Sequence, residues 1–394
     1  MKNITINILV YFSLFTVVSA YPLTPETTNR GIIIERATGS IKLVDTARRI
    51  LLADIDGMGD LSHASAVFSR DEQYAYVFGR DGGLTKIDLH TGNIEKRIKQ
   101  AGNSIGGAIS RDGKYVAASN YEPGGIRVFT ADTLEPVVDI PAIYSDEGNP
   151  EYSRVVGLVD APGKRFIASL YDAGEIWVID LDDTEQPEIR KFTNIGLQPY
   201  DALITPDGRY YIAGLYGENG LAVLDLQHLD RGVRRVLQHY GKDEKELPVY
   251  KMPHLEGWAV AGDFLFIPAI GHRAVHVIDK NNWQEITRIT TYGQPVFAIA
   301  RPDGRQVWVN FAFPNNSYVE IIDVKKLAVV KRLKPGKAVL HMEFTAQGDE
   351  VWISVRDEDR VNIYNTMTFD RIGLLEADKP SGIFFSNRAH KIGL

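Results

Sequence analysis

Short runs of alternating hydrophobic and polar residues recur along the chain from about residue 30 to its end. Each unit begins with an apolar stretch, passes a turn such as Pro206-Asp207-Gly208, and continues into a strand rich in Tyr, Val and Ile. A second strand follows a polar loop and ends in a hydrophobic residue and an Asp or similar polar residue. Asp-Gly and Pro-Asp-Gly tolerate the backbone conformations of tight turns. The pattern therefore predicts an all-β chain without long helices.

The repeat has a regular period. Its second-strand endings lie about 45 residues apart, which is the length of one propeller blade. The endings are Asp45, Asp88, Thr130, Asp180, Asp225, Asp279, Asp323 and Asn365. We therefore predict an eight-bladed β-propeller, with seven or nine blades as the alternatives. Independent β-hairpins would leave these apolar strands unburied.

The two ends of the repeat region complement each other. Residues 30–46 read as two outer strands that lack a preceding inner strand, and residues 381–386 read as an inner strand with little after it. Pairing these halves in one blade would close the ring and remove two exposed strand edges. We expect the N- and C-terminal strands to share a blade.

The first twenty residues have the pattern of a secretory signal peptide. Lys2 gives a short positive start, residues 4–18 are almost wholly apolar, and Val18-Ser19-Ala20 supplies small residues for cleavage. We expect a signal peptide at 1–20, a single propeller domain at 21–394, and export to the periplasm. The chain has no cysteine, so neither a disulfide nor an N-terminal cysteine for lipid attachment is possible.

Composition and motifs exclude several function classes. The formal net charge is −7, and nucleic-acid binding needs a clustered basic surface. The sequence contains no Gly-x-x-x-x-Gly-Lys loop for a nucleotide phosphate. Its Gly-x-Ser-x-Gly match at Gly102-Asn103-Ser104-Ile105-Gly106 lies where an inner strand is expected to begin, not in the strand-to-helix turn that a serine nucleophile needs. Any binding or catalytic site must therefore be built from another set of residues.

Candidate side chains gather where the inner strands should begin, at one mouth of the channel. Function in propellers favours such a rigid concave mouth. Around the ring this position holds His63, Ser104, Arg154, Pro199, Leu255, Pro295, Val339 and Pro380, with His254 beside Leu255. Arginine binds carboxylates through two parallel hydrogen bonds. The pattern favours an anion-binding site with histidine at this mouth.

Several segments together carry a resemblance to a known family. They are Ser62-His63-Ala64-Ser65, Phe78-Gly79-Arg80-Asp81-Gly82, Thr133-Leu134-Glu135-Pro136, residues 348–355, residues 361–367 and Lys391-Ile392-Gly393-Leu394. On these segments the chain resembles the NirF family of heme d1 biosynthesis proteins. It is also similar to the d1-heme propeller domain of cytochrome cd1 nitrite reductase. The similarity covers essentially all of the mature chain.

The resemblance implies that heme d1, or a d1 precursor, binds at the mouth of the propeller. His63 matches the proximal histidine that ligates the heme iron. Arg36 and Arg80 match arginines that hold heme carboxylates, and Arg154 matches an arginine that follows a Pro-Glu pair. These four residues are the expected cofactor-binding set.

The resemblance also implies a distal side of the ligand. His254 matches one of two distal histidines, and Arg301 stands where the second precedes a proline. We expect them to act as proton donor and charge stabiliser, with Glu151 as a further acid. An arginine that binds heme in the reductase is replaced at or near Gly106. No Cys-x-x-Cys-His attaches a c-type heme. These departures argue against nitrite reduction.

The resulting hypothesis is a periplasmic protein that binds a late d1 precursor, such as dihydro-heme d1, and takes part in its oxidation or dehydrogenation. Two alternatives stay open: a non-catalytic carrier that delivers d1 to cytochrome cd1 nitrite reductase, and an interaction propeller without a cofactor. The expected partners are the tetrapyrrole and, transiently, the reductase and other d1 assembly proteins. We expect no nucleotide, nucleic acid, membrane span or lipid anchor.

Overall fold

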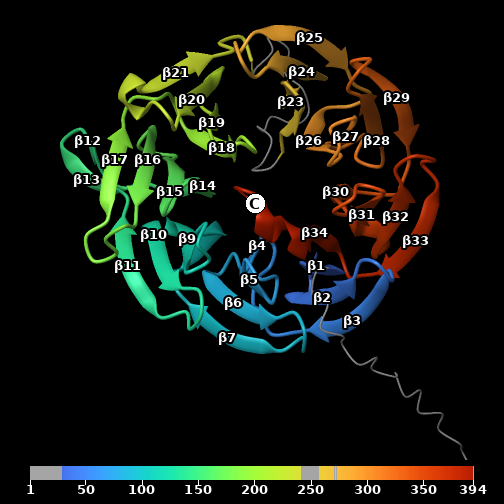
Figure 1. The fold of residues 1–394 in the computed structure, drawn as a ribbon, viewed down its shortest axis with the longest axis horizontal. Coiled ribbons are helices and arrows are strands. Elements are labelled where there is room, and N and C mark those ends of the chain that lie inside the picture. The colour runs from blue at the N-terminus through green and yellow to red at the C-terminus, as the bar shows by residue number, and fades with distance from the viewer. Residues whose placement is uncertain (1–28, 241–256, 270, 272, 394) are drawn as a thin grey trace, which may run out of the picture.

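Eight four-stranded antiparallel sheets stand as blades around a central channel (Figure 1). The computed structural model describes residues 29–240, 257–269, 271 and 273–393. In these residues the strands read as the sequence predicts, with two-residue alternation and turns rich in Asp and Gly. The predicted all-β, eight-bladed propeller is confirmed.

The first four blades follow one another along the chain. They are β4 (Ser65–Phe68), β5 (Tyr74–Phe78), β6 (Gly83–Asp88) and β7 (Ile94–Lys99) in blade 1; β8 (Asn103–Ile109), β9 (Tyr115–Glu122), β10 (Gly124–Thr130) and β11 (Pro136–Pro141) in blade 2; β14 (Val155–Ala161), β15 (Arg165–Leu170), β16 (Glu175–Asp180) and β17 (Glu188–Phe192) in blade 3; β18 (Pro199–Ile204), β19 (Tyr210–Leu215), β20 (Leu221–Asp225) and β21 (Val233–Val236) in blade 4.

The second half repeats the arrangement. It comprises β22 (Ala259–Ala261), β23 (Phe264–Ala269), β24 (Ala274–Asp279) and β25 (Glu285–Thr290) in blade 5; β26 (Pro295–Ala300), β27 (Gln306–Phe311), β28 (Val319–Asp323) and β29 (Ala328–Leu333) in blade 6; β30 (Val339–Phe344), β31 (Glu350–Val355), β32 (Arg360–Asn365) and β33 (Arg371–Glu376) in blade 7; β34 (Pro380–Phe385), β1 (Arg30–Glu35), β2 (Ser40–Asp45) and β3 (Ile50–Ile55) in blade 8. Outside the blades lie a hairpin, β12 (Ile143–Asp146) and β13 (Asn149–Tyr152), and the short 3₁₀ helices η2 (Leu229–Arg231), η4 (Arg356–Glu358) and η5 (Ser386–His390).

Blade 8 closes the ring as the sequence predicts. The C-terminal β34 is its inner strand and pairs antiparallel with β1, with Ile33 opposite Ile383. β1 and β2 are the two middle strands, because β3 forms the outer edge. The predicted strand endings coincide with the ends of the third strands, at Asp45, Asp88 and their counterparts.

Neighbouring blades pack through aliphatic and aromatic side chains. The contact of blade 8 with blade 1 buries Ile32, Phe384, Phe68 and Val77 in one cluster. Burying each such side chain contributes roughly 1.5–3 kcal/mol. This packing gives the loops at both ends of the channel a rigid support. In the residues that the structure describes, no helix is long and apolar enough to cross a membrane.

The direction of the inner strands distinguishes the two ends of the channel. We call the end where the inner strands begin the front mouth and the end where they finish the rear mouth. Six inner strands, β8, β14, β18, β26, β30 and β34, shift register against their partner within the first half of the strand. In β26 the side chain of Asn310 accepts the freed Phe297 N–H at 2.9 Å. Such irregularities redirect side chains, and Phe297 lines the channel.

Candidate functional site

A cavity of about 340 Å³ opens at the front mouth. Arg36 and His63 lie on its wall, together with Tyr200, Phe297 and His341 from other blades. Gly106 lines the same cavity, and a Cβ there would come within 3.0 Å of the Ser65 hydroxyl oxygen. The fold therefore brings a histidine and an arginine from two adjacent blades to one concave site.

Arg36 and Arg80 are cationic groups without a carboxylate partner. Both are partly buried. Neither guanidinium makes a hydrogen bond or an ion pair with any residue that the structure describes. Hydrogen bonds from Ser62, and to a smaller extent the charges of Arg80 and Arg36, lower the pKa of Asp60. These two arginines can therefore bind the carboxylates of a ligand.

Arg154 is at the same mouth but its charge is already matched. Its Nε donates to Asp172 Oδ2 at 3.0 Å, and its backbone N–H donates to the same oxygen at 2.8 Å. Burial would raise the pKa of Asp172, but the hydrogen bonds from Arg154 outweigh it and lower this pKa. Arg154 is thus a weaker candidate for a ligand carboxylate than Arg36 or Arg80.

Tyrosine rings connect these arginines to the cavity. The guanidinium carbons of Arg80 and Arg154 lie 5.4 and 5.9 Å from the centroid of the Tyr121 ring. Arg154 also lies 4.1 Å from the centroid of Tyr171, whose ring contacts Tyr200 edge to face at 5.8 Å. Tyr200 lines the cavity. The result is an aromatic wall beside the anion-binding side chains.

One repeat position supplies Tyr121 and Tyr171 of this wall, and it was not predicted from the sequence; Tyr200 comes from the inner strand β18. The repeat position lies at the end of the second strand of each blade, at the front mouth. From blade 8 to blade 4 it holds Arg36, Arg80, Tyr121, Tyr171 and Tyr216. The similarity of residues 119–122, 169–172 and 214–217 could have revealed it. The predicted site included only residues where inner strands begin.

Two predicted residues do not reach this site. Arg301 follows β26 and therefore lies at the rear mouth, where its Nε donates to the Gly348 carbonyl oxygen at 2.7 Å. Its predicted place on the open side of a ligand bound by His63 is wrong. Glu151 is exposed on β13, whose hairpin lies at the outer edge of the ring (Figure 1), and it lines neither channel cavity. His254 lies outside the described residues.

Comparisons with known proteins identify the family of this chain. The family described as "Cytochrome D1 heme domain" matches residues 25–389. A protein named "Protein NirF" from Pseudomonas aeruginosa is 58% identical over 364 residues, covering 92% of this chain and 93% of the relative. The chain belongs to the NirF family. A second "Protein NirF", from Stutzerimonas stutzeri, is 54% identical and covers 98% of both chains.

A solved structure related to the NirF family contains a ligand. It is described as "Dihydro-heme d1 dehydrogenase NirN in complex with DHE". It superimposes with a TM-score of 0.81 at 25% identity, covering 95% of this chain and 78% of that chain. The propeller of this NirF-family chain is therefore shared with a tetrapyrrole-modifying protein.

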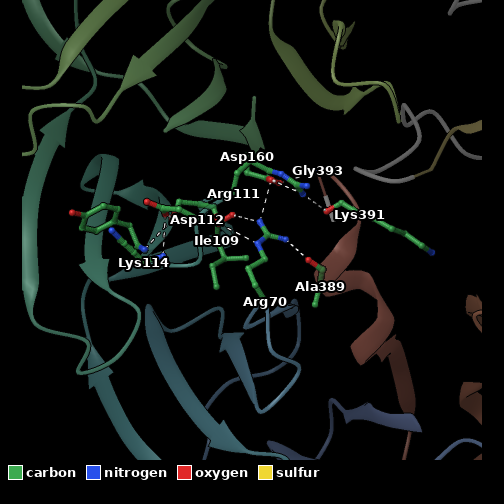
Figure 2. Close-up of polar contacts among 11 residues, drawn as sticks. Arg70, Ile109, Arg111, Asp112, Lys114, Asp160, Ala389, Lys391 and Gly393 are labelled. Atoms are coloured by element: carbon green, nitrogen blue, oxygen red, sulfur yellow. Dashed lines mark hydrogen bonds and ion pairs between the residues drawn. The ribbon is translucent and has the colours of Figure 1, made fainter. Parts of the chain in front are cut away.

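The C-terminal segment of the NirF-family chain lies at the rear mouth (Figure 2). Arg70 Nη2 donates to Asp160 Oδ2 at 3.1 Å, and the Gly393 N–H donates to Asp160 Oδ1 at 2.7 Å. Arg70 also donates to the Ala389 carbonyl oxygen. Burial raises the pKa of Asp160 against the opposing effect of the arginine charges. Contacts from blades 1 and 3 thus hold the chain end across the channel.

Behind this segment lies a second cavity, of about 830 Å³. Its charged lining residues are largely paired. Arg388 and Glu343 form a buried ion pair at 2.7 Å, and Arg301 pairs with Asp303. The front and rear cavities share Phe297 and His341 on their walls. His341 was not among the residues predicted from the sequence.

Proposed function

We propose that this chain is a periplasmic protein of heme d1 biosynthesis that binds a late d1-type tetrapyrrole at the front mouth. Dihydro-heme d1 is the leading candidate because a related propeller is named for acting on it. The observation that carries the proposal is the pair Arg36 and Arg80, which lack carboxylate partners in the described structure, beside the His63 cavity. Cations at a cavity of this kind suit an acidic ligand.

The residues present fit such a group. His63 would hold the iron, Arg36 and Arg80 would bind peripheral carboxylates, and Arg154 would contribute less because Asp172 neutralises it. The ring of Tyr200 would face a planar ligand from the side of the aromatic wall. When bound, the iron tetrapyrrole supplies the electron chemistry. The chain would bind and orient it and exclude water around it.

Dehydrogenation of the bound precursor is the reaction that we propose. Two hydrogens leave the macrocycle as two protons and two electrons, and a new carbon–carbon double bond forms. The two protons would go to solvent. The two electrons would pass to two equivalents of an external one-electron acceptor, because the chain has no cysteine with which to attach a c-type heme. Transient contact with other d1 assembly proteins or with cytochrome cd1 nitrite reductase would deliver the product. A signal peptide at residues 1–20 would export the chain.

A visible-spectrum titration with dihydro-heme d1 tests binding. We expect the wild-type chain to shift the absorption bands and His63→Ala to lose the shift that histidine ligation causes. His90→Ala, at an exposed histidine in the turn after β6, is the matched control. No shift with the wild-type chain, or the same shift with His63→Ala, would contradict the proposal.

A mass measurement tests turnover. Incubation with dihydro-heme d1 and ferricyanide as electron acceptor should give a product lighter by two hydrogens, at a rate above that of the protein-free mixture. Binding without this change would favour a carrier. The two outcomes separate binding from catalysis.

A further inference from the structure

His341 occupies an unusual position on the wall of the channel. It is the third residue of inner strand β30, within the register shift between Val339 and Met342. Ser354 replaces the missing strand pairing: its Oγ accepts the His341 N–H at 2.8 Å and donates to the His341 carbonyl oxygen at 3.2 Å. The irregularity leaves the imidazole lining both the front and the rear cavity.

A backbone contact fixes which nitrogen of His341 carries the proton. The Ile383 N–H of the neighbouring blade donates to Nδ1 at 3.2 Å. A nitrogen that accepts a hydrogen bond has no proton of its own, so in the neutral ring the proton is on Nε2. Burial, together with the positive charge of Arg388, lowers the pKa of His341 to about 4, with Glu343 acting weakly in the opposite direction. The side chain is therefore a neutral Nε2–H donor at pH 7.

This donor has no acceptor within the described structure. The ring is held by Phe297, at a centroid distance of 6.4 Å, and by Phe384, at 5.3 Å. The polar contacts of the residue are those of its backbone and of Nδ1, and Nε2 makes none with the described residues. A donor fixed by its neighbours but left unpaired on a cavity wall is suited to an incoming oxygen.

We propose that His341 is a ligand-binding residue, whose Nε2–H donates to a carbonyl or carboxylate oxygen on the part of the tetrapyrrole that reaches deepest into the channel. The inference rests on the proposed function. It deepens that function because Arg36 and Arg80 would bind carboxylates of the ligand at the front mouth, whereas His341 would bind an oxygen of the ligand inside the channel. A site that hydrogen-bonds such a group disfavours analogues lacking it, because its own donor is then unpaired. His341 would thereby select among tetrapyrroles.

Two substitutions test the roles of Nδ1 and Nε2 of His341 separately. In His341→Asn the amide oxygen stands near the former Nδ1 and can still accept from Ile383, but no donor reaches the Nε2 position. In His341→Gln the amide nitrogen stands near the former Nε2 and can still donate. The first variant preserves the structural contact, and the second preserves the proposed ligand contact.

The test measures binding of two probes to the full-length chain by absorption titration. The probes are dihydro-heme d1 and iron octaethylporphyrin, which has no peripheral oxygen. We expect His341→Asn to weaken dihydro-heme d1 binding roughly 5- to 30-fold, the value of one hydrogen bond in a desolvated site. Binding of iron octaethylporphyrin should not change. His341→Gln should recover most of the lost affinity.

The outcomes distinguish this inference from the function on which it rests. Equal loss for both probes would assign His341 a structural role and overturn the inference. Unchanged affinity of His341→Asn for dihydro-heme d1, with tight wild-type binding, would also overturn it and leave the proposed function intact. Failure of the wild-type chain to bind dihydro-heme d1 would overturn both.

Discussion

Arginines lie at both mouths of the channel, but they differ in whether a carboxylate of the chain pairs with them. At the rear mouth Arg70, Arg301 and Arg388 each contact a carboxylate of the chain itself. At the front mouth Arg36 and Arg80 contact none among the described residues. Arg154, at the front mouth, is paired with Asp172, so the contrast concerns Arg36 and Arg80 alone. It supports our proposal that these two arginines bind a ligand, whereas the rear arginines make contacts within the chain.

The largest effect should come from breaking the rear pair. Arg388→Met would leave Glu343 buried without its partner, and losing one member of a buried pair costs about 3–5 kcal/mol. Urea unfolding should show this loss, whereas Arg36→Met at the front mouth should change stability by only about 0.5 kcal/mol. The double variant Arg388→Met/Glu343→Leu should recover most of the stability. Similar destabilisation by Arg36→Met would contradict the comparison.

The next effect concerns affinity at the front mouth. Arg36→Gln and Arg80→Gln should each weaken dihydro-heme d1 binding by roughly 10- to 100-fold, because a hydrogen bond to a charged group contributes about 1.5–3 kcal/mol. Arg305→Gln, at an exposed rear-mouth arginine, serves as the control and should bind normally. Added salt should weaken wild-type binding more than binding to the Arg36→Gln/Arg80→Gln variant. If Arg305→Gln lost as much affinity as Arg36→Gln or Arg80→Gln, the front arginines would not be specific for the ligand.

The third prediction concerns how the free energy of unfolding depends on pH through His341, which lies between the two mouths. The pKa of His341 is about 4 in the folded chain against an ordinary value of 6.5. As the pH falls from 7 to 5 the unfolded chain takes up a proton that the folded chain does not. Stability should therefore fall by about 2 kcal/mol over this range. His341→Asn has no titrating group at this position, so its stability relative to the wild type should rise by about 2 kcal/mol between pH 7 and pH 5. A constant difference between the two proteins would contradict this assignment.

The propeller ring could be predicted from the sequence, but only part of the candidate site could. The strand endings and Asp-Gly turns are local signals, so they located eight blades and the closure of β34 on β1. The contact of Tyr171 with Tyr200 depends on how adjacent blades face each other, which no local signal reports. Arg301 was misplaced because its motif was given more weight than its position in the turn after an inner strand. That turn belongs to the rear mouth.

The smallest effect should come from the aromatic wall. Tyr171→Leu removes the ring beside the Arg154 guanidinium and the edge contact to Tyr200, interactions worth about 0.5–1.5 kcal/mol. Affinity for dihydro-heme d1 should fall roughly 2- to 10-fold, because Tyr200 would be less firmly held on the cavity wall. Tyr171→Phe keeps the ring and should bind as the wild-type chain does. If Tyr171→Phe lost as much affinity as Tyr171→Leu, the hydroxyl would matter and the wall would not act through its rings.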